Sequence, residues 1–99
     1  MFRLLIIEND FELLKHEQLH FDIAELFARK IRRKFKEIQN NREARFSIYW
    51  ESYNVIWKEC RELQKRFDSE TNHGRDLNAN YIWSIKLKDE LSQLEKVRE

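Results

Sequence analysis

The sequence predicts an all-α fold, a bundle of three or four helices that forms a single domain over residues 1–99. Three observations support this prediction. The chain has no proline and one glycine, Gly74, the two residue types that make most tight turns. Apolar residues recur at steps of three and four over long stretches, which is the period of a helix. The charged fraction is 37% and the hydrophobic fraction 41%, a balance typical of amphipathic helices with solvated outer faces.

The N-terminal stretch 2–7 is apolar and reads as either a strand or an apolar arm. A lone strand must pair with another strand, and the rest of the chain offers none, so a strand here would imply a second subunit. Further along, Asn9 and Asp22 each have a glutamate three residues later, which is the spacing of a helix-capping box. Either two helices meet near Phe21 or one helix runs through it.

A helical pattern covers residues 23–39 and ends at a pair of asparagines. Asn40 and Asn41 favour a break because their side chains compete for backbone hydrogen bonds. The apolar residues that recur with helical period are Ile23, Ala24, Phe27, Ile31, Phe35 and Ile38.

The next helix is predicted at about residues 42–67. Its apolar side chains fall within an arc of roughly 140° at 100° per residue; they are Phe46, Tyr49, Trp50, Tyr53, Ile56, Trp57, Cys60, Leu63 and Phe67. An arc this wide packs against two neighbours, so we expect this helix to be the central element. Its aromatic residues are expected to lie in the core, the more common position for aromatics at helical spacing, and the alternative is a platform on which bases stack. Ile48 and Val55 fall nearly opposite the arc and suggest an additional interface.

A polar segment, residues 68–76, contains Gly74 and is predicted to be a loop. Asp76 or Asn78 then caps a last helix that runs to about Val97. The apolar positions of this last helix are Trp83, Leu87, Leu91, Leu94 and Val97.

Charge is segregated along the chain although the net charge is only +1. Residues 29–45 hold eight basic and two acidic side chains, and most of the basic ones lie in the stretch 29–36. On a helix this stretch directs four of them to the outer face, namely Arg29, Arg32, Arg33 and Lys36. Such a face could contact an acidic protein, or neutralise the phosphates of a nucleic acid with strong salt dependence.

The motif His16-Glu17-Gln18-Leu19-His20 matches H-E-x-x-H and, over these five residues, resembles the signature of the zincin metallopeptidases. The resemblance implies that both imidazoles hold a zinc ion while Glu17 activates a bound water. The chain departs from the family in having Asp22 two positions after the second histidine, and it lacks the glycine-containing extension. Residues considered as a third ligand are Glu37, Glu43 and His73.

Other classes of site are disfavoured by composition. Cys60 is the only cysteine, so neither an internal disulfide nor a cysteine-based zinc site is expected. One glycine does not suffice for phosphate-binding loops, dinucleotide-binding turns or a nucleophile elbow. The apolar run 4–7 is too short for a signal peptide or a membrane span, so we expect a cytoplasmic protein without membrane contact.

The pattern therefore predicts a small protein–protein interaction module, an adaptor, inhibitor or assembly subunit that binds and does not catalyse. The residues expected to contact the partner are Arg29, Arg32, Arg33, Lys36, Ile48 and Val55. No cofactor, catalytic residue or metal ligand is assigned in this prediction, and a homodimer is an option. Two alternatives stay open: a nucleic-acid-binding module that uses the basic helix 29–36, and a zinc hydrolase that uses His16, Glu17 and His20.

Overall fold

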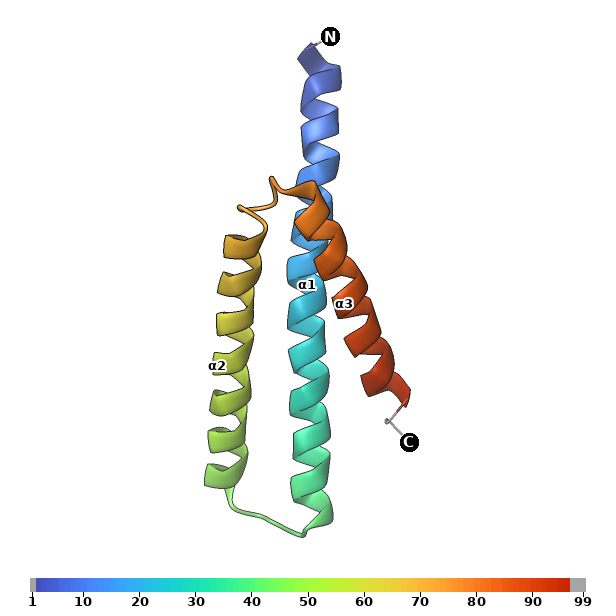
Figure 1. Cartoon of the computed structure of the whole chain (residues 1–99). Helices are drawn as coiled ribbons and strands as arrows, with labels where there is room; N and C mark the ends of the chain where they lie inside the picture. Colours follow the sequence, from blue (N-terminus) through green and yellow to red (C-terminus); the bar gives the residue numbers. More distant parts are fainter. Residues whose placement is uncertain (1, 97–99) are drawn as a thin grey trace.

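The computed structural model describes residues 2–96 of the chain, and their side chains from residue 11 to residue 94. It contains three helices: α1 (Phe2–Asn40), α2 (Phe46–Glu70) and α3 (Leu77–Lys96). No strand occurs in this described part of the chain, so the predicted all-α bundle is confirmed with three helices (Figure 1).

The first helix settles two alternatives that the sequence left open. One helix runs through Phe21, and residues 2–7 belong to it, so the strand alternative for residues 2–7 is wrong. The physical reason is that a helix satisfies its backbone hydrogen bonds internally, whereas a strand at residues 2–7 would need a partner. At its N-terminal end α1 extends beyond the level of the other two helices (Figure 1).

The central element of the bundle is α1, not the helix predicted at 42–67. Both α2 and α3 pack against α1, on different sides of it (Figure 1). The molecule is accordingly elongated, with principal extents of 61 × 25 × 22 Å. The wide apolar arc of α2 suggested two neighbours, but along most of its length α2 has only α1 beside it.

The core lies where the C-terminal half of α2 and the length of α3 from Trp83 onward meet α1. Its buried members are Leu19, Ile23, Leu26, Phe27, Cys60, Phe67, Trp83 and Leu87, and the half-buried Ile56, Leu63, Leu91 and Leu94 pack against them. Most of these positions were predicted from helical periodicity.

The aromatic run of α2 departs from that prediction. Phe46 is 75% exposed and Trp50 54% exposed, while the buried residues of α2 are Cys60 and Phe67. The prediction that the whole run lies in the core is therefore wrong. Periodicity located the apolar face of α2 correctly, but α1 covers only part of that face.

The two connections differ from their predicted bounds. The helix predicted to begin at residue 42 begins at Phe46, and α2 continues to Glu70, so Asp68 lies in a helix instead of the predicted loop. The start of α3 is as expected, because the backbone amide of Ala79 donates to Asp76 Oδ1 at 3.0 Å. Among the described residues, no helix combines the length and apolar character needed to cross a membrane.

Candidate metal centre

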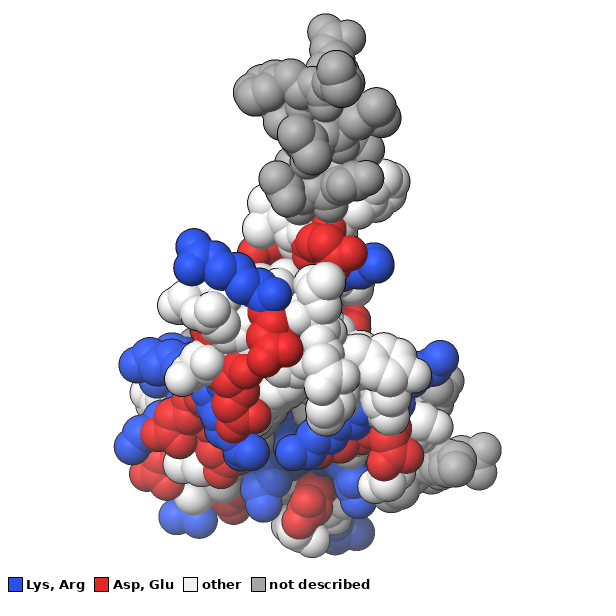
Figure 2. Space-filling view, turned by 45° about the horizontal axis from the view of Figure 1, so that its top comes forward, with Lys and Arg blue, Asp and Glu red and all other residues white. Residues whose placement is uncertain are grey.

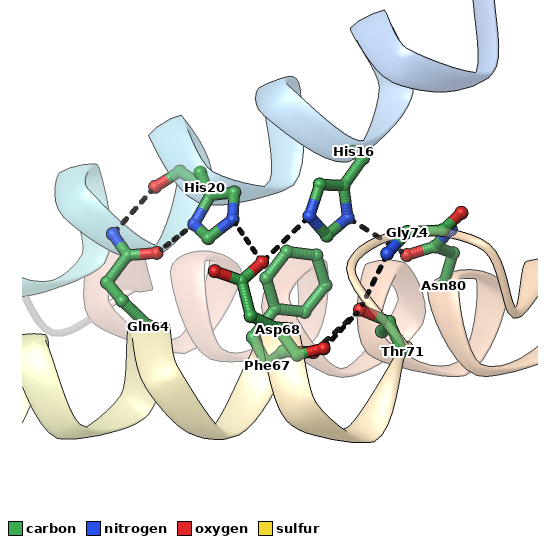
Figure 3. A network of polar contacts seen from close by, with 8 residues as sticks. All are labelled: His16, His20, Gln64, Phe67, Asp68, Thr71, Gly74 and Asn80. Atoms are coloured by element: carbon green, nitrogen blue, oxygen red, sulfur yellow. Dashed lines mark hydrogen bonds and ion pairs between the residues drawn. The ribbon is translucent and has the colours of Figure 1, made fainter. Parts of the chain in front are cut away.

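His16 and His20 lie one turn apart on α1 and approach the same carboxylate on α2. His16 Nε2 is 2.9 Å and His20 Nε2 2.8 Å from Asp68 Oδ1 (Figure 3). Side chains four residues apart share one face of a helix, which is why both imidazoles point the same way. His16 is buried, whereas His20 and Asp68 are partly exposed, so the cluster has one side open to solvent.

The protonation of His20 is fixed by Gln64. The amide nitrogen of Gln64 donates to the backbone carbonyl of His20 at 3.0 Å, and its Oε1 lies 2.5 Å from His20 Nδ1. Rotating the amide by 180° would place two oxygens together, so Oε1 must be the atom that faces the ring. His20 Nδ1 therefore carries a hydrogen and donates a hydrogen bond to Gln64 Oε1.

A second amide, from α3, does the same for His16. Asn80 donates from Nδ2 to the carbonyl of Gly74 at 2.9 Å, and its Oδ1 lies 3.4 Å from His16 Nδ1 (Figure 3). The same reasoning makes His16 Nδ1 a donor. In both imidazoles Nδ1 thus donates to an amide oxygen and Nε2 faces Asp68. Metal-binding histidines are commonly oriented in this way, by a hydrogen bond from the ring nitrogen that does not bind the metal.

Aromatic packing and a close backbone approach hold the two rings in place. Phe67 stacks on His16 at a centroid distance of 4.6 Å and contacts His20 edge-on at 4.8 Å. On the other side, a Cβ atom added to Gly74 would lie 2.7 Å from His16 Cγ. Gly74 also has φ of +89°, a conformation that other residues adopt only with strain. Glycine is therefore required here twice over, for its backbone angle and for its lack of a side chain.

The donor set fits a divalent transition metal. In the neutral form with its hydrogen on Nδ1, each imidazole presents a lone pair at Nε2, and these lone pairs converge with those of a carboxylate oxygen. Such a group needs either protons or one cation between its members. The ligand atoms of His16, His20 and Asp68 all lie within 4.8 Å of one another. Tetrahedral zinc separates its ligand atoms by about 3.3 Å. The two N···O distances would widen by about 0.5 Å, and a pair of ligand atoms as far apart as 4.8 Å would approach by about 1.5 Å.

In the metal-free chain, hydrogens on Nε2 take the place of a cation between the two imidazoles and Asp68. Desolvation by burial raises the pKa of Asp68, but the hydrogen bonds from His20 and His16 outweigh that effect and hold the pKa below its usual value. The ionised carboxylate, which is the form that binds metals, is therefore the favoured form.

The sequence assigned no metal ligand and raised His16 and His20 only in the zinc-hydrolase alternative; the structure places both in this cluster. The residues considered there as a third ligand were Glu37, Glu43 and His73, and none of them belongs to the cluster. Asp68 was missed because it was placed in a loop. A helix that continued to residue 70 would have put Asp68 near the face of Phe67 and Gln64. Nothing in the local sequence, however, links Asp68 to His16, which is 52 residues away.

The residues predicted to contact a partner are spread over several environments. Arg32, Arg33 and Lys36 are exposed, Ile48 is half-buried, and Val55 is 59% exposed. Arg29 has structural contacts, since it donates to Glu25 at 3.0 Å and to the backbone carbonyl of Leu91 on α3 at 3.3 Å. Figure 2 shows acidic and basic side chains mixed over the face in view, where neither sign prevails.

No curated protein and no solved structure matches the chain. A family model does match it, over residues 10–74, a range that includes the H-E-x-x-H motif, Gln64, Asp68 and Gly74. The match covers well over half of the 99 residues. The chain thus belongs to the family described as "Bacterial protein of unknown function (DUF922)".

Proposed function

We propose that this protein binds zinc through His16, His20 and Asp68 and uses the site for hydrolysis. The observation that carries the proposal is the convergence of both Nε2 atoms on Asp68 Oδ1, with each Nδ1 held by an amide. Three protein ligands leave one position of a tetrahedral zinc site for water, which is the pattern of catalytic and not of structural zinc.

Zinc at this position would act as a Lewis acid and lower the pKa of a bound water. Glu17 is the residue that would take the proton from that water. It follows His16 directly, its side chain is exposed, and at 100° per residue it lies about 60° from His20 around α1. On the helical wheel the Glu17 carboxylate therefore lies on the flank of the two histidines. The roles divide clearly: Asp68 and the histidines hold the metal, and Glu17 moves the proton.

The first experiment measures metal binding. Purified protein is dialysed against zinc and its metal content determined, with iron measured in parallel because a set of two histidines and one carboxylate also suits Fe(II). We expect one zinc per chain, and none for His16→Ala. The matched control is His73→Ala, which removes an exposed histidine outside the cluster and should leave zinc content unchanged. A folded wild-type protein that takes up no metal would end the proposal.

The second experiment separates binding from hydrolysis. Glu17→Gln removes the base without removing a ligand, so the variant should keep its zinc and lose hydrolysis of a quenched fluorescent peptide library. A matched control is Glu12→Gln, an acidic side chain on the same helix one turn earlier. If zinc-loaded wild-type protein and Glu17→Gln hydrolyse the library at the same rate, the site binds zinc without being catalytic.

The protein-interaction role inferred from the sequence stays a prediction. Exposed apolar side chains on α3 support it, and they are Leu77, Tyr81, Ile82 and Ile85, each more than half exposed. A row of this kind on one helix is typical of a contact surface. Crosslinking of the full chain in lysate, compared between wild type and Ile82→Lys, tests it; equal patterns of crosslinked proteins would argue against an interface on α3.

A further inference from the structure

Four aromatic side chains of α2 form a continuous row, which we call the aromatic ladder: Phe46, Trp50, Tyr53 and Trp57. Successive ring centroids are 6.2, 5.8 and 6.4 Å apart, and successive ring planes differ by 17°, 15° and 10°. The residue spacing of four, three and four keeps the rings on one face of the helix. The ladder is therefore an ordered array of near-parallel rings.

The aromatic ladder lies outside the core. None of its members belongs to the buried cluster, and Trp57 is 38% exposed in addition to the more exposed Phe46 and Trp50. The third helix does not cover the ladder, because Trp83 of α3 contacts α2 at Arg66 and Glu70. These two residues lie about 160° around α2 from Trp50. Tyr53 is half-buried between these exposed rings. A row of large exposed aromatic side chains of this kind is typical of a binding surface.

The basic stretch of α1 lies beside the turns of α2 that carry the first members of the aromatic ladder. Phe35 contacts Tyr49 at a centroid distance of 5.2 Å, which places the basic stretch 29–36 beside the first turns of α2. On the helical wheel of α1, Arg32 lies about 60° from Phe35 on one side and about 60° from Arg29 on the other. Phe35 contacts α2, and Arg29 donates to a backbone carbonyl of α3. The buried residues of α1 occupy the opposite arc, so Arg32 points outward, and Lys36 follows it one turn later.

These cations are available to a new partner. Arg32 is paired with Glu25 at 3.1 Å, but exposed pairs of this kind contribute little and exchange readily. Lys36 is exposed and forms no ion pair among the described residues. Both cations belong to the excess of six positive charges over residues 29–45, which gives this end of the molecule a positive potential near the aromatic rings.

We propose that the aromatic ladder, with Arg32 and Lys36, binds single-stranded nucleic acid. Bases stack on the rings, which accept any base because every base has a π-face, and the cations neutralise phosphates of the same strand. Charge decides between this partner and an apolar protein segment, since a polyanion complements the positive flank and an apolar segment does not. A duplex should bind more weakly, because its bases are stacked internally and cannot reach the rings.

The test uses fluorescence anisotropy with the full chain and a fluorescein-labelled oligo-dT of 20 nucleotides. We expect Trp50→Ala and Trp57→Ala each to weaken binding by about tenfold, within the range found for single base-stacking contacts. The double variant Arg32→Glu/Lys36→Glu should reduce the slope of log affinity against log salt by about two. The matched controls lie on α3: Tyr81→Ala, an exposed aromatic outside the ladder, and Lys88→Glu, an exposed cation. Both should stay within about twofold of wild type.

Two results overturn the proposal. The first is a wild-type protein that does not bind the oligonucleotide, or ladder variants that bind it as well as wild type does. The second is sedimentation showing a wild-type dimer that Trp50→Ala converts to a monomer, with no oligonucleotide binding, since a second copy would then be the occupant. The proposal is independent of the zinc site: His16→Ala, which should remove zinc, should leave oligonucleotide binding intact.

Discussion

Polar side chains are usually exposed and apolar ones buried, and each end of the α1–α2 pair departs from one half of this rule. At the metal-centre end, polar side chains are buried: His16 is 4% and Asn80 8% exposed. At the other end, the aromatic ladder leaves apolar rings in water. Burying a polar group is unfavourable unless it is hydrogen-bonded, and exposing apolar area forgoes about 25 cal/mol per Å². The exposed rings therefore contribute little to stability, whereas the buried polar groups are tolerated only if they are hydrogen-bonded.

What differs between the two ends is the third helix. α3 and the loop before it close over the metal-centre end through Asn80, Gly74 and Trp83. In the described residues every buried side-chain nitrogen and oxygen has a hydrogen-bond partner, so the polar cluster is fully satisfied. At the ladder end α2 packs on α1 alone. The comparison implies that stability resides near the metal centre and that the ladder is energetically separate from it.

A matched pair of substitutions gives the largest expected difference between the ends. Phe67→Ala should lower the free energy of unfolding by about 3–5 kcal/mol, because this fully buried ring contacts His16, His20 and Trp83. Phe46→Ala should change it by less than about 0.5 kcal/mol, as the ring is 75% exposed. Urea unfolding measures both. Similar losses at the two positions would refute the separation of the ends.

The second prediction concerns the loop that closes the metal centre. Gly74→Ala should lower the free energy of unfolding by about 1–3 kcal/mol, because the new Cβ meets His16 and the backbone angle is strained for alanine. The same variant should bind zinc more weakly, since His16 must shift. The neighbouring His73→Gly is the control: His73 has φ of +56°, so glycine relieves strain there and should leave both quantities nearly unchanged. A fully stable Gly74→Ala variant would contradict the close approach.

Removing an amide that orients a histidine should have an intermediate effect, and this effect should be confined to the affinity for zinc. Gln64→Leu takes away the acceptor for His20 Nδ1 and should weaken zinc binding by about 10–100-fold. Gln93→Leu on α3 is the control, since Gln93 contacts only Asp89 at the surface. Isothermal titration with zinc checks the pair. Equal affinities would mean that Gln64 does not hold the ring in its binding orientation.

The smallest expected effect is on acid stability. The pKa of Asp68 is lower in the folded chain than the usual value for aspartate. The ionised carboxylate therefore contributes its full stabilisation at a pH above that usual value, and the contribution is lost as the pH falls through the lowered pKa of the folded chain. In metal-free protein, wild type should therefore lose stability more steeply in this acid range than Asp68→Asn, which cannot titrate. Urea midpoints measured from pH 6 to pH 2.5 show the difference. Parallel curves would assign the acid sensitivity to other groups.

Zinc itself provides a further separation of the ends. A ligand that binds only the folded state stabilises it by about 2.7 kcal/mol at a concentration one hundred times its dissociation constant. Zinc should stabilise Trp50→Ala as much as it stabilises wild type.

Local patterns were sufficient for most of the secondary structure. The absence of proline, the single glycine, the helical period and the polar breaks near residues 40 and 72 predicted three or four helices, and Asp76 was one of two residues considered as the cap of the last one. The H-E-x-x-H spacing likewise determined that His16 and His20 share a face. These features depend on residues within one or two turns of each other, and such relations are encoded in the local sequence.

Contacts between helices decided the rest. The apolar arc of α2 shows which side chains share a face, but the tertiary packing determines how much of that face a neighbour covers, so Cys60 is buried and Trp50 is not. Asp68 became the third candidate ligand only because α2 continues to Glu70 and packs antiparallel to α1. The sequence by itself therefore determined the helices and the histidine pair. The fold decided which helix is central, which carboxylate meets the histidines and which aromatic rings remain in solvent, because these depend on residues far apart in the chain.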